Sequence, residues 1–277
     1  MARGKTMRTL INAIAISLMS VLITVTTYAA NTNSPKEPTQ KNVRYGERVR
    51  NVLDFCQAKS DKPAPVAIYF HGGGFRVGDK GQIGKSASCF TDKGVSVVAA
   101  NYPFNKTESK GKQITGAEIL ASGKRVVQLV RSKAKEWNID PSRVGLCGSS
   151  AGSILSEWIT FAPDAADAKS EDPVARQSTK IEALAAYNQP WKEVTEKIIP
   201  TMTKDSHPLW LLAGSTRDDK IHNPAYAQMM KAMADELGVY VELYGSSKND
   251  IKPAQSDNRF GAMTIFFAKQ FKMEQGK

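Results

Sequence analysis

The feature that most constrains this chain is the pentapeptide Gly148-Ser149-Ser150-Ala151-Gly152, which has the pattern G-x-S-x-G. A run of small and branched residues (143–147) precedes it, and an apolar run with helical character (153–159) follows it. In a strand–turn–helix context this pattern lifts a serine hydroxyl clear of a sheet, and its glycines let strand and helix approach closely. The pattern therefore indicates that Ser150 is a nucleophile. The alternative is an ordinary loop rich in small residues.

Apolar runs alternate with helix-like segments along the chain. Runs that are apolar on both faces are typical of strands in parallel sheets; they cover residues 64–70, 94–102, 143–147, 181–187, 209–213 and 239–244. Residues 43–55 are expected to supply one or two edge strands. Helical spacing marks residues 114–137, a segment opened by Asn223 and Pro224, and a segment capped by Asn258. The sequence predicts an α/β fold: a mostly parallel central sheet flanked by helices on both faces.

The amino-terminal segment has the layout of a secretory signal peptide. Arg3, Lys5 and Arg8 precede an apolar run (10–25), and small residues follow at Thr27-Tyr28-Ala29. We expect a signal peptide over residues 1–29, a linker over 30–41 and one domain over 42–277. The apolar run is short for a membrane span, so we expect cleavage and export to the periplasm or the medium. The alternative is an uncleaved membrane anchor.

Charge and cysteine content narrow the function classes. The chain has 38 Lys and Arg against 27 Asp and Glu, and loss of the leader removes three positive charges, leaving 35 − 27 = +8. The basic residues are scattered, which fits solubility better than nucleic-acid binding. Cys56, Cys89 and Cys147 suit neither a metal site nor a disulfide framework. A Cys56–Cys89 bridge is one alternative, and Cys147 is expected to be a small core residue. No metal or other cofactor is expected.

Four segments with chemically useful residues follow separate strands. They are His71 to Gly74, Ser150, Asp218 with Asp219, and the loop after Tyr244. Ligands of parallel sheets bind at the carboxyl ends of the strands, so these segments should converge there.

Two of these segments carry a family resemblance. His71-Gly72-Gly73-Gly74-Phe75 after a buried strand, and residues 138–144 leading into the G-x-S-x-G pattern, resemble the α/β-hydrolase superfamily. Within it they resemble the esterase/lipase group with an HGGG loop, including hormone-sensitive-lipase-like carboxylesterases. The resemblance covers most of the chain beyond the leader and implies an α/β-hydrolase domain over residues 42–277. The connection over residues 188–208 is too short for a large cap domain.

The resemblance also implies an oxyanion hole. Its donors would be the backbone amides of Gly73, Gly74 and Ala151, since such amides stabilise the negative oxygen of an acyl-transfer transition state. His71 would hold the loop and would not act as a base. The alternative is a tight turn in which the glycines serve conformation only.

The expected order of the triad is serine, acid, histidine. Asp218 follows the strand at 209–213 as the acid of the family does, and Asp219 is the near alternative. A solvated polar turn is the other interpretation. The histidine departs from the family, because none occurs after His222. His222 is the best candidate for a recruited base, with a surface histidine at a helix entry as the alternative. His207 is expected to be a loop residue.

These residues predict an exported serine carboxylesterase that hydrolyses small carboxylic esters through an acyl-enzyme on Ser150, with Asp218 and His222 as its catalytic partners. The alternative is a catalytically impaired α/β-hydrolase-fold binding protein, because the usual late histidine is absent. A peptidase ranks third. The expected partner is a small-molecule ester, with no nucleic acid and, after signal cleavage, no membrane. The oligomeric state stays open.

Overall fold

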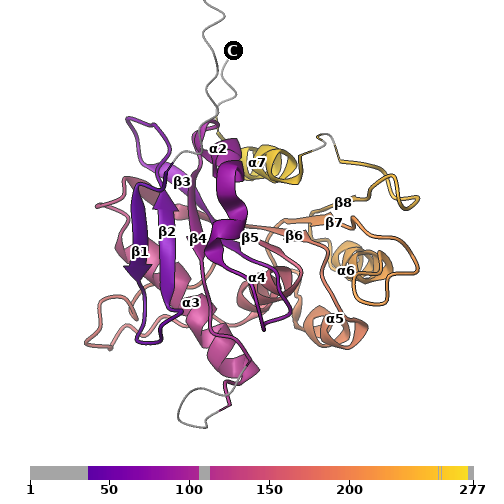
Figure 1. Cartoon of the computed structure of the whole chain (residues 1–277), viewed down its shortest axis with the longest axis horizontal. Helices are drawn as coiled ribbons and strands as arrows, with labels where there is room; N and C mark the ends of the chain where they lie inside the picture. The colour runs from indigo at the N-terminus through magenta and orange to yellow at the C-terminus, as the bar shows by residue number, and fades with distance from the viewer. Residues whose placement is uncertain (1–36, 106–112, 255, 257, 274–277) are drawn as a thin grey trace, which may run out of the picture. The chain divides into compact units, whose positions relative to one another are not determined.

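In the part of the chain that the structure describes, eight strands form one sheet in the order β1-β2-β4-β3-β5-β6-β7-β8 (Figure 1). Their bounds are β1 Gln40–Arg44, β2 Val52–Cys56, β3 Ala64–Phe70, β4 Ser96–Ala100, β5 Ile139–Ser149, β6 Ala183–Tyr187, β7 Leu209–Leu212 and β8 Val241–Tyr244. β1 and β2 are antiparallel to their neighbours, and β3 to β8 are parallel. The mostly parallel sheet predicted from the apolar runs is confirmed.

This computed structural model describes residues 37–105, 113–254, 256 and 258–273. The expected signal peptide (1–29) and most of the expected linker lie outside the described residues. Residues 35–277 form one compact unit, and its first strand begins at Gln40, two residues before the expected start of the domain. Within the described ranges, no helix is both long enough and apolar enough to span a bilayer.

Helices cover both faces of the sheet, as predicted. The longer ones are α3 Gly116–Ser132, α4 Ala151–Phe161, α6 Ala225–Glu236 and α7 Arg259–Gln270, and the shorter ones are η1 Lys80–Ser86, α2 Ala87–Thr91, α5 Lys192–Ile198 and η2 Ile199–Thr201. Buried residues of α3, α4 and α6 belong to one core cluster. Those of α2 and α7 belong to a second cluster, and these two helices lie side by side (Figure 1).

The order of the strands positions the functional residues. After β3 the chain moves to one side for β4, then returns through α3 to place β5 on the other side of β3. Phe70 at the end of β3 is level with Gly148 near the end of β5. Such a reversal of strand order opens a ligand site between the loops that follow the two strands. The glycine loop and the G-x-S-x-G turn are these two loops.

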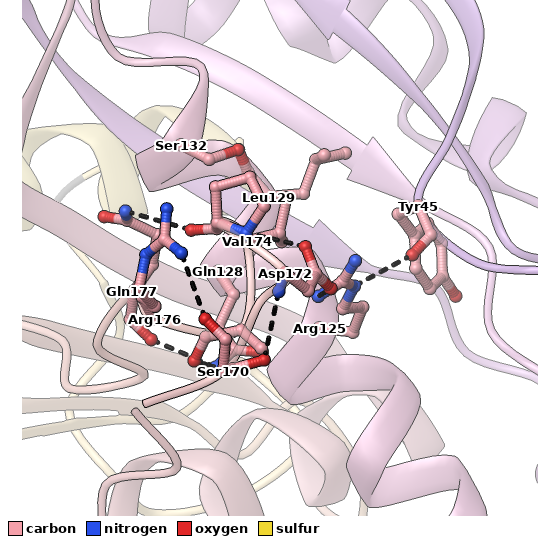
Figure 2. A network of polar contacts seen from close by, with 12 residues as sticks. Tyr45, Arg125, Gln128, Leu129, Ser132, Ser170, Asp172, Val174, Arg176 and Gln177 are labelled. Carbon is pink, nitrogen blue, oxygen red and sulfur yellow. Dashed lines mark hydrogen bonds and ion pairs between the residues drawn. The ribbon is translucent and has the colours of Figure 1, made fainter. Parts of the chain in front are cut away.

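The segment 163–180 after α4 has little regular structure, and polar contacts fix it to α3 (Figure 2). The amide nitrogen of Gln128 donates to the carbonyls of Ala165, Ala175 and Gln177 at 3.2, 3.0 and 3.0 Å. Nη1 of Arg125 lies 2.6 Å from a carboxylate oxygen of Asp172. The bonds from Gln128 give carbonyls of the irregular segment a partner, and the ion pair holds the segment against α3 before the chain returns to β6.

No disulfide links Cys56 to Cys89, so the suggested bridge does not form. Cys56 is buried on the sheet, whereas the Cys89 sulfur accepts a hydrogen bond from Asn258 at 3.2 Å. Cys147 is fully buried within β5, as expected for a small core residue.

Candidate active site

Ser150 occupies the single residue between β5 and α4, with φ 53° and ψ −119°. A side chain strongly disfavours this backbone conformation, so surrounding contacts must hold it. The Ser150 amide donates to the carbonyl of Tyr187 on the neighbouring strand at 2.9 Å. The Ser150 carbonyl accepts the amide of Ser153 at 2.9 Å, in the first turn of α4. The strand–turn–helix context inferred from the sequence is therefore present.

Close approach of the backbone explains the two glycines of the pattern. A Cβ atom on Gly152 would overlap the carbonyl oxygen of Phe70 at the end of β3. A Cβ atom on Gly148 would overlap the backbone of Gly152 itself. Neither residue has a positive φ, so lack of space and not backbone conformation requires glycine here.

An imidazole lies within reach of the serine. Nε2 of His222 is 3.0 Å from Oγ of Ser150. His222 lies in the loop between β7 and α6, three residues before the first residue of that helix. Its side chain is 24% exposed, so solvent reaches it but does not surround it. A neutral Nε2 at this distance can accept the hydroxyl proton of the serine.

The carboxylate beside this imidazole belongs to Asp219, and the choice of Asp218 from the sequence differs from this geometry. Oδ2 of Asp219 lies 3.6 Å from Nδ1 of His222. The backbone amides of Ile221 and His222 both donate to Oδ1 of Asp219 at 2.8 Å. These two bonds turn the Asp219 side chain toward the imidazole, whereas Asp218 is exposed at the preceding turn.

The same contacts keep Asp219 ionised. Its pKa is lowered, mainly because the amide of His222 donates to the carboxylate, with further contributions from the Ile221 amide and the Ser215 hydroxyl. A charged carboxylate near Nδ1 favours the tautomer that carries its proton on that nitrogen and stabilises the imidazolium form.

The glycine loop runs directly past the serine. A carbon placed on Gly72 would lie 3.4 Å from Cβ of Ser150. Gly73 and Gly74 have φ values of 125° and 60°, which only glycine adopts readily. Across the described part of the chain, no hydrogen bond engages the amides of Gly73, Gly74 or Ala151. The three expected donors therefore lie unengaged in the two segments that meet at Ser150.

His71 holds this loop through contacts of both its ring nitrogens. Its Nδ1 lies 2.7 Å from the Gly72 carbonyl, and its Nε2 lies 3.1 Å from a guanidinium nitrogen of Arg50. Because Arg50 can only donate, Nε2 is the acceptor and Nδ1 carries the proton. Burial lowers the pKa of His71 to about 4, so the ring is neutral near pH 7. With both nitrogens engaged, His71 holds the loop and is not a base.

Arg50 and Tyr102 complete this support, and neither was singled out from the sequence. Arg50 donates to the carbonyls of Tyr102 and Gly78 at 2.9 and 3.0 Å, and its guanidinium lies 3.8 Å from the ring centroid of Phe104. The Tyr102 ring stacks on His71 with centroids 4.4 Å apart. Strand pairing in the order β2-β4-β3 brings these distant segments together, and no local motif marks them.

The loop after β8, where the family places its histidine, supports the acid-bearing loop. Nδ2 of Asn249 donates to the carbonyls of Ala213 and Ser215 at 2.8 Å each. The Ser246 hydroxyl donates to the carbonyl of Gly214 at 3.0 Å. The Ser215 side chain contacts Asp219. The loop after β8 therefore fixes the backbone of the segment that positions the candidate acid.

Trp191 forms an aromatic wall beside the glycine loop. Its indole lies 3.8 Å from the position of a Cβ atom on Gly74. Trp191 has a φ of 60°, which is rare for a bulky side chain and occurs where surrounding contacts enforce it. Its amide donates to the carbonyl of Ile221 at 2.9 Å, which ties this wall to the loop of His222.

The remaining histidine is remote from this chemistry. His207 lies in the loop before β7, as expected, and burial lowers its pKa. Within the described ranges, no group of three or more His, Cys, Asp or Glu side chains could hold a metal ion.

The open, mostly parallel sheet with a glycine loop and a serine elbow at its carboxyl edge defines a hydrolase of the α/β-hydrolase esterase class. The chain belongs to the BD-FAE family, whose model matches residues 53–235, more than half of the chain. The resemblance inferred from the two motifs is confirmed at this level.

Individual relatives are distant. Gut esterase 1 of Caenorhabditis elegans is 27% identical over 124 residues, which are 43% of this chain and 22% of that protein. The chain thus spans less than a quarter of the length of this curated relative. A crystal structure of an acetyl ester-xyloside bifunctional hydrolase from Caldicellulosiruptor lactoaceticus matches with a TM-score of 0.66 and 20% identity, over 86% of this chain and 98% of that one. The Est2 esterase of Thermogutta terrifontis matches with a TM-score of 0.63 and 20% identity, over 84% and 91%. These structures share the fold.

Proposed function

We propose that this chain is an exported serine carboxylesterase that hydrolyses small carboxylic esters through an acyl-enzyme on Ser150. The observation that carries the proposal is the 3.0 Å separation between Oγ of Ser150 and Nε2 of His222. A serine hydroxyl is a weak nucleophile until a neighbouring base accepts its proton. His222 supplies that base from a position in the chain that the family pattern does not use.

In the first half of the reaction, Oγ of Ser150 attacks the ester carbonyl as its proton passes to Nε2 of His222. The carbonyl oxygen becomes an oxyanion, and the unengaged amides of the glycine loop and Ala151 donate to it. His222 then gives its proton to the departing alkoxide as the ester C–O bond breaks. The products of this half are an alcohol and an acyl group on Ser150.

In the second half, His222 takes a proton from water as the water oxygen attacks the acyl carbon. The bond to Ser150 breaks, Oγ recovers the proton from His222, and the carboxylic acid leaves. Asp219 remains a carboxylate throughout and stabilises the imidazolium that forms twice in each cycle. Its lowered pKa supports this role.

Short acyl groups are the substrates that the site supports best. Trp191 stands directly beside Gly74, and the chain has only the short helices α5 and η2 between β6 and β7 instead of a large cap. Structural neighbours include a carbohydrate esterase from gut microbiota, with a TM-score of 0.68 and 16% identity over 84% of this chain and 96% of that one. We therefore propose acetyl and similar small esters, including acetylated carbohydrates, as substrates.

The test compares hydrolysis of 4-nitrophenyl acetate by the wild type with that by Ser150→Ala and His222→Ala. We expect kcat/KM to fall by about 10³-fold or more in both variants, as for loss of a triad member. His207→Ala is the matched control, because it removes a histidine remote from the serine, and its rate should stay within about twofold of the wild type. Unchanged hydrolysis by Ser150→Ala contradicts the proposal.

A non-catalytic binding protein is the second candidate, and the missing late histidine favours it. That interpretation predicts that an ester substrate binds without turnover. Release of 4-nitrophenol beyond one equivalent per chain, abolished in Ser150→Ala, excludes it.

Export is the remaining part of the proposal, and it depends on the composition of residues 1–29. Expression of the full chain should yield a processed protein outside the cytoplasm, shorter by the leader on mass spectrometry. A chain that starts at residue 30 should remain in the cytoplasm. Equal distribution of the two forms contradicts export.

A further inference from the structure

A cavity whose lining does not include Ser150 lies at the carboxyl ends of β6, β7 and β8. Its volume is about 740 Å³, within the range of small-molecule sites. Residues that line it include Tyr187, Gly214, Ser246, Ser256, Asn258 and Arg259. None of these residues is assigned to the chemistry proposed for Ser150.

Arg259 is the residue that distinguishes this cavity. Its guanidinium lies 4.8 Å from the ring centroids of both Tyr187 and Phe260. Its Nε atom is buried without a hydrogen-bond partner. No described side chain forms an ion pair with the Arg259 guanidinium, which instead lies against the two rings. The residue as a whole is only partly buried, so burial of Nε leaves the outer N–H groups of the guanidinium available to an acceptor.

Other arginines of the chain form ion pairs, whereas Arg259 does not form one with any described residue. Those that pair with carboxylates are Arg48, Arg125, Arg131, Arg143 and Arg217. Arg259 instead lies over two aromatic rings at the wall of a cavity. Aromatic faces hold a guanidinium flat and leave its N–H edge free to meet a planar or tetrahedral oxyanion.

The rest of the cavity suits an anion attached to a hydroxylated molecule. Among the described residues that line the cavity, Arg259 is the one that carries a charge. Serine hydroxyls supply further polar groups, because Ser86, Ser247 and Ser256 line the cavity. Tyr187 and Phe260 supply faces on which a sugar ring can pack.

Tyr187 connects this cavity with the candidate active site. Its backbone carbonyl accepts the amide of Ser150 at 2.9 Å, and its ring contacts the guanidinium of Arg259. Gly214, which also lines the cavity, immediately precedes Ser215, whose side chain contacts Asp219. A ligand in the cavity would therefore bind next to Tyr187, which holds Ser150, and next to the segment of Ser215, which contacts Asp219.

We propose that this cavity binds the anionic group of a sugar-sized molecule, a carboxylate or a phosphate, and that Arg259 is the residue that pairs with it. The inference does not depend on turnover at Ser150. The anion belongs either to an acidic ester that the serine cleaves or to a separate ligand, and both sources share this chemistry.

Calorimetric titration of Ser150→Ala tests the binding without any catalysis. The probes are D-glucuronate and D-glucose 6-phosphate, with D-glucose as the neutral control. We expect at least one anion to bind saturably and at least tenfold more tightly than D-glucose. Adding Arg259→Gln should weaken that binding about tenfold or more, as for loss of a charged hydrogen bond. Arg176→Gln, an equal change of charge in the exposed segment after α4, should leave it unchanged.

The proposal is overturned if neither anion binds more tightly than D-glucose, or if the Arg259→Gln variant retains wild-type affinity for the anion. Arg259→Lys keeps the charge and guards against a folding defect, since it should bind more tightly than Arg259→Gln. Equal loss in both variants, with unchanged thermal unfolding, contradicts a charge-based site.

Kinetics with the wild-type serine then identify the source of the anion. If it belongs to the substrate, Arg259→Gln should raise KM for acetylated glucuronate by about tenfold and leave KM for acetylated glucose unchanged. If it belongs to a separate ligand, Arg259→Gln should change neither KM, while the binding measured by calorimetry is lost. Both results support an anion site at Arg259.

Discussion

The two adjacent aspartates of the loop after β7 allow a matched test of the acid. Asp219→Asn and Asp218→Asn remove the same charge one residue apart, but only Asp219 faces His222. The side-chain carbonyl of an asparagine at 219 can still accept the amides of Ile221 and His222, so the loop should keep its shape. The variant then lacks the negative charge beside Nδ1.

The size of the effect follows from the 3.6 Å separation of Oδ2 and Nδ1. Coulomb attraction at that distance is worth roughly 1 kcal/mol at the dielectric constant of water and roughly 5 kcal/mol at an effective value near 20. The side chains of His222 and Asp219 are 24% and 28% exposed, which places the site between these limits. Since 1.4 kcal/mol is about a factor of ten, we expect kcat to fall about 10- to 10³-fold.

Steady-state hydrolysis of 4-nitrophenyl acetate measures this effect. Asp219→Asn should lower kcat within that range, and Asp218→Asn should stay within about twofold of the wild type, as for an exposed substitution. A larger loss in Asp218→Asn, or equal losses in the two variants, would refute the assignment of Asp219.

Three further predictions concern stability. Glu157 of α4 is buried with no hydrogen-bond partner among the described residues, and burial raises its pKa to about 8. Native Glu157 therefore resists ionisation, and the stability of the native state falls as the pH rises from 4.5 to 8. Glu157→Gln should therefore gain up to about 5 kcal/mol relative to the wild type between pH 4 and pH 9 in urea unfolding, unlike exposed Glu236→Gln. Gly152→Ala should lower the free energy of unfolding by about 3 kcal/mol through overlap with β3, whereas Gly116→Ala, which meets its nearest neighbour at 3.9 Å, should not. Asn249→Ala should lower it by about 2 kcal/mol through two lost hydrogen bonds and reduce kcat through the acid loop.

Much of the fold could be predicted because its signals are local. Near-continuous apolar runs mark β3, β4 and β7, and helical spacing marks α3 and α7. The ends of these elements depend on capping, which is less visible in the pattern. The helix expected over 114–137 spans Gly116–Ser132 because Thr115 and Glu118 form a capping box at its start. Likewise, α6 begins at Ala225, after the Asn223 side chain accepts its amide.

The site was predictable where motifs carry it. Ser150 and the glycine loop follow directly from two short patterns, and the structure brings His222 next to the serine. The choice between Asp218 and Asp219 depends on which side chain receives two backbone amides, and the turn conformation decides that. Supports such as Arg50 and Asn249 act across strand pairs and carry no pattern in the sequence.

The central claim, that His222 activates Ser150, is tested most directly by covalent labelling with a fluorophosphonate, followed over time by intact-protein mass spectrometry. The account predicts one adduct per chain, located on Ser150 by peptide mapping, and labelling slower by about 10³-fold in His222→Ala. Labelling of Ser150 at the same rate in the wild type and in His222→Ala, or an adduct on another residue, would contradict it.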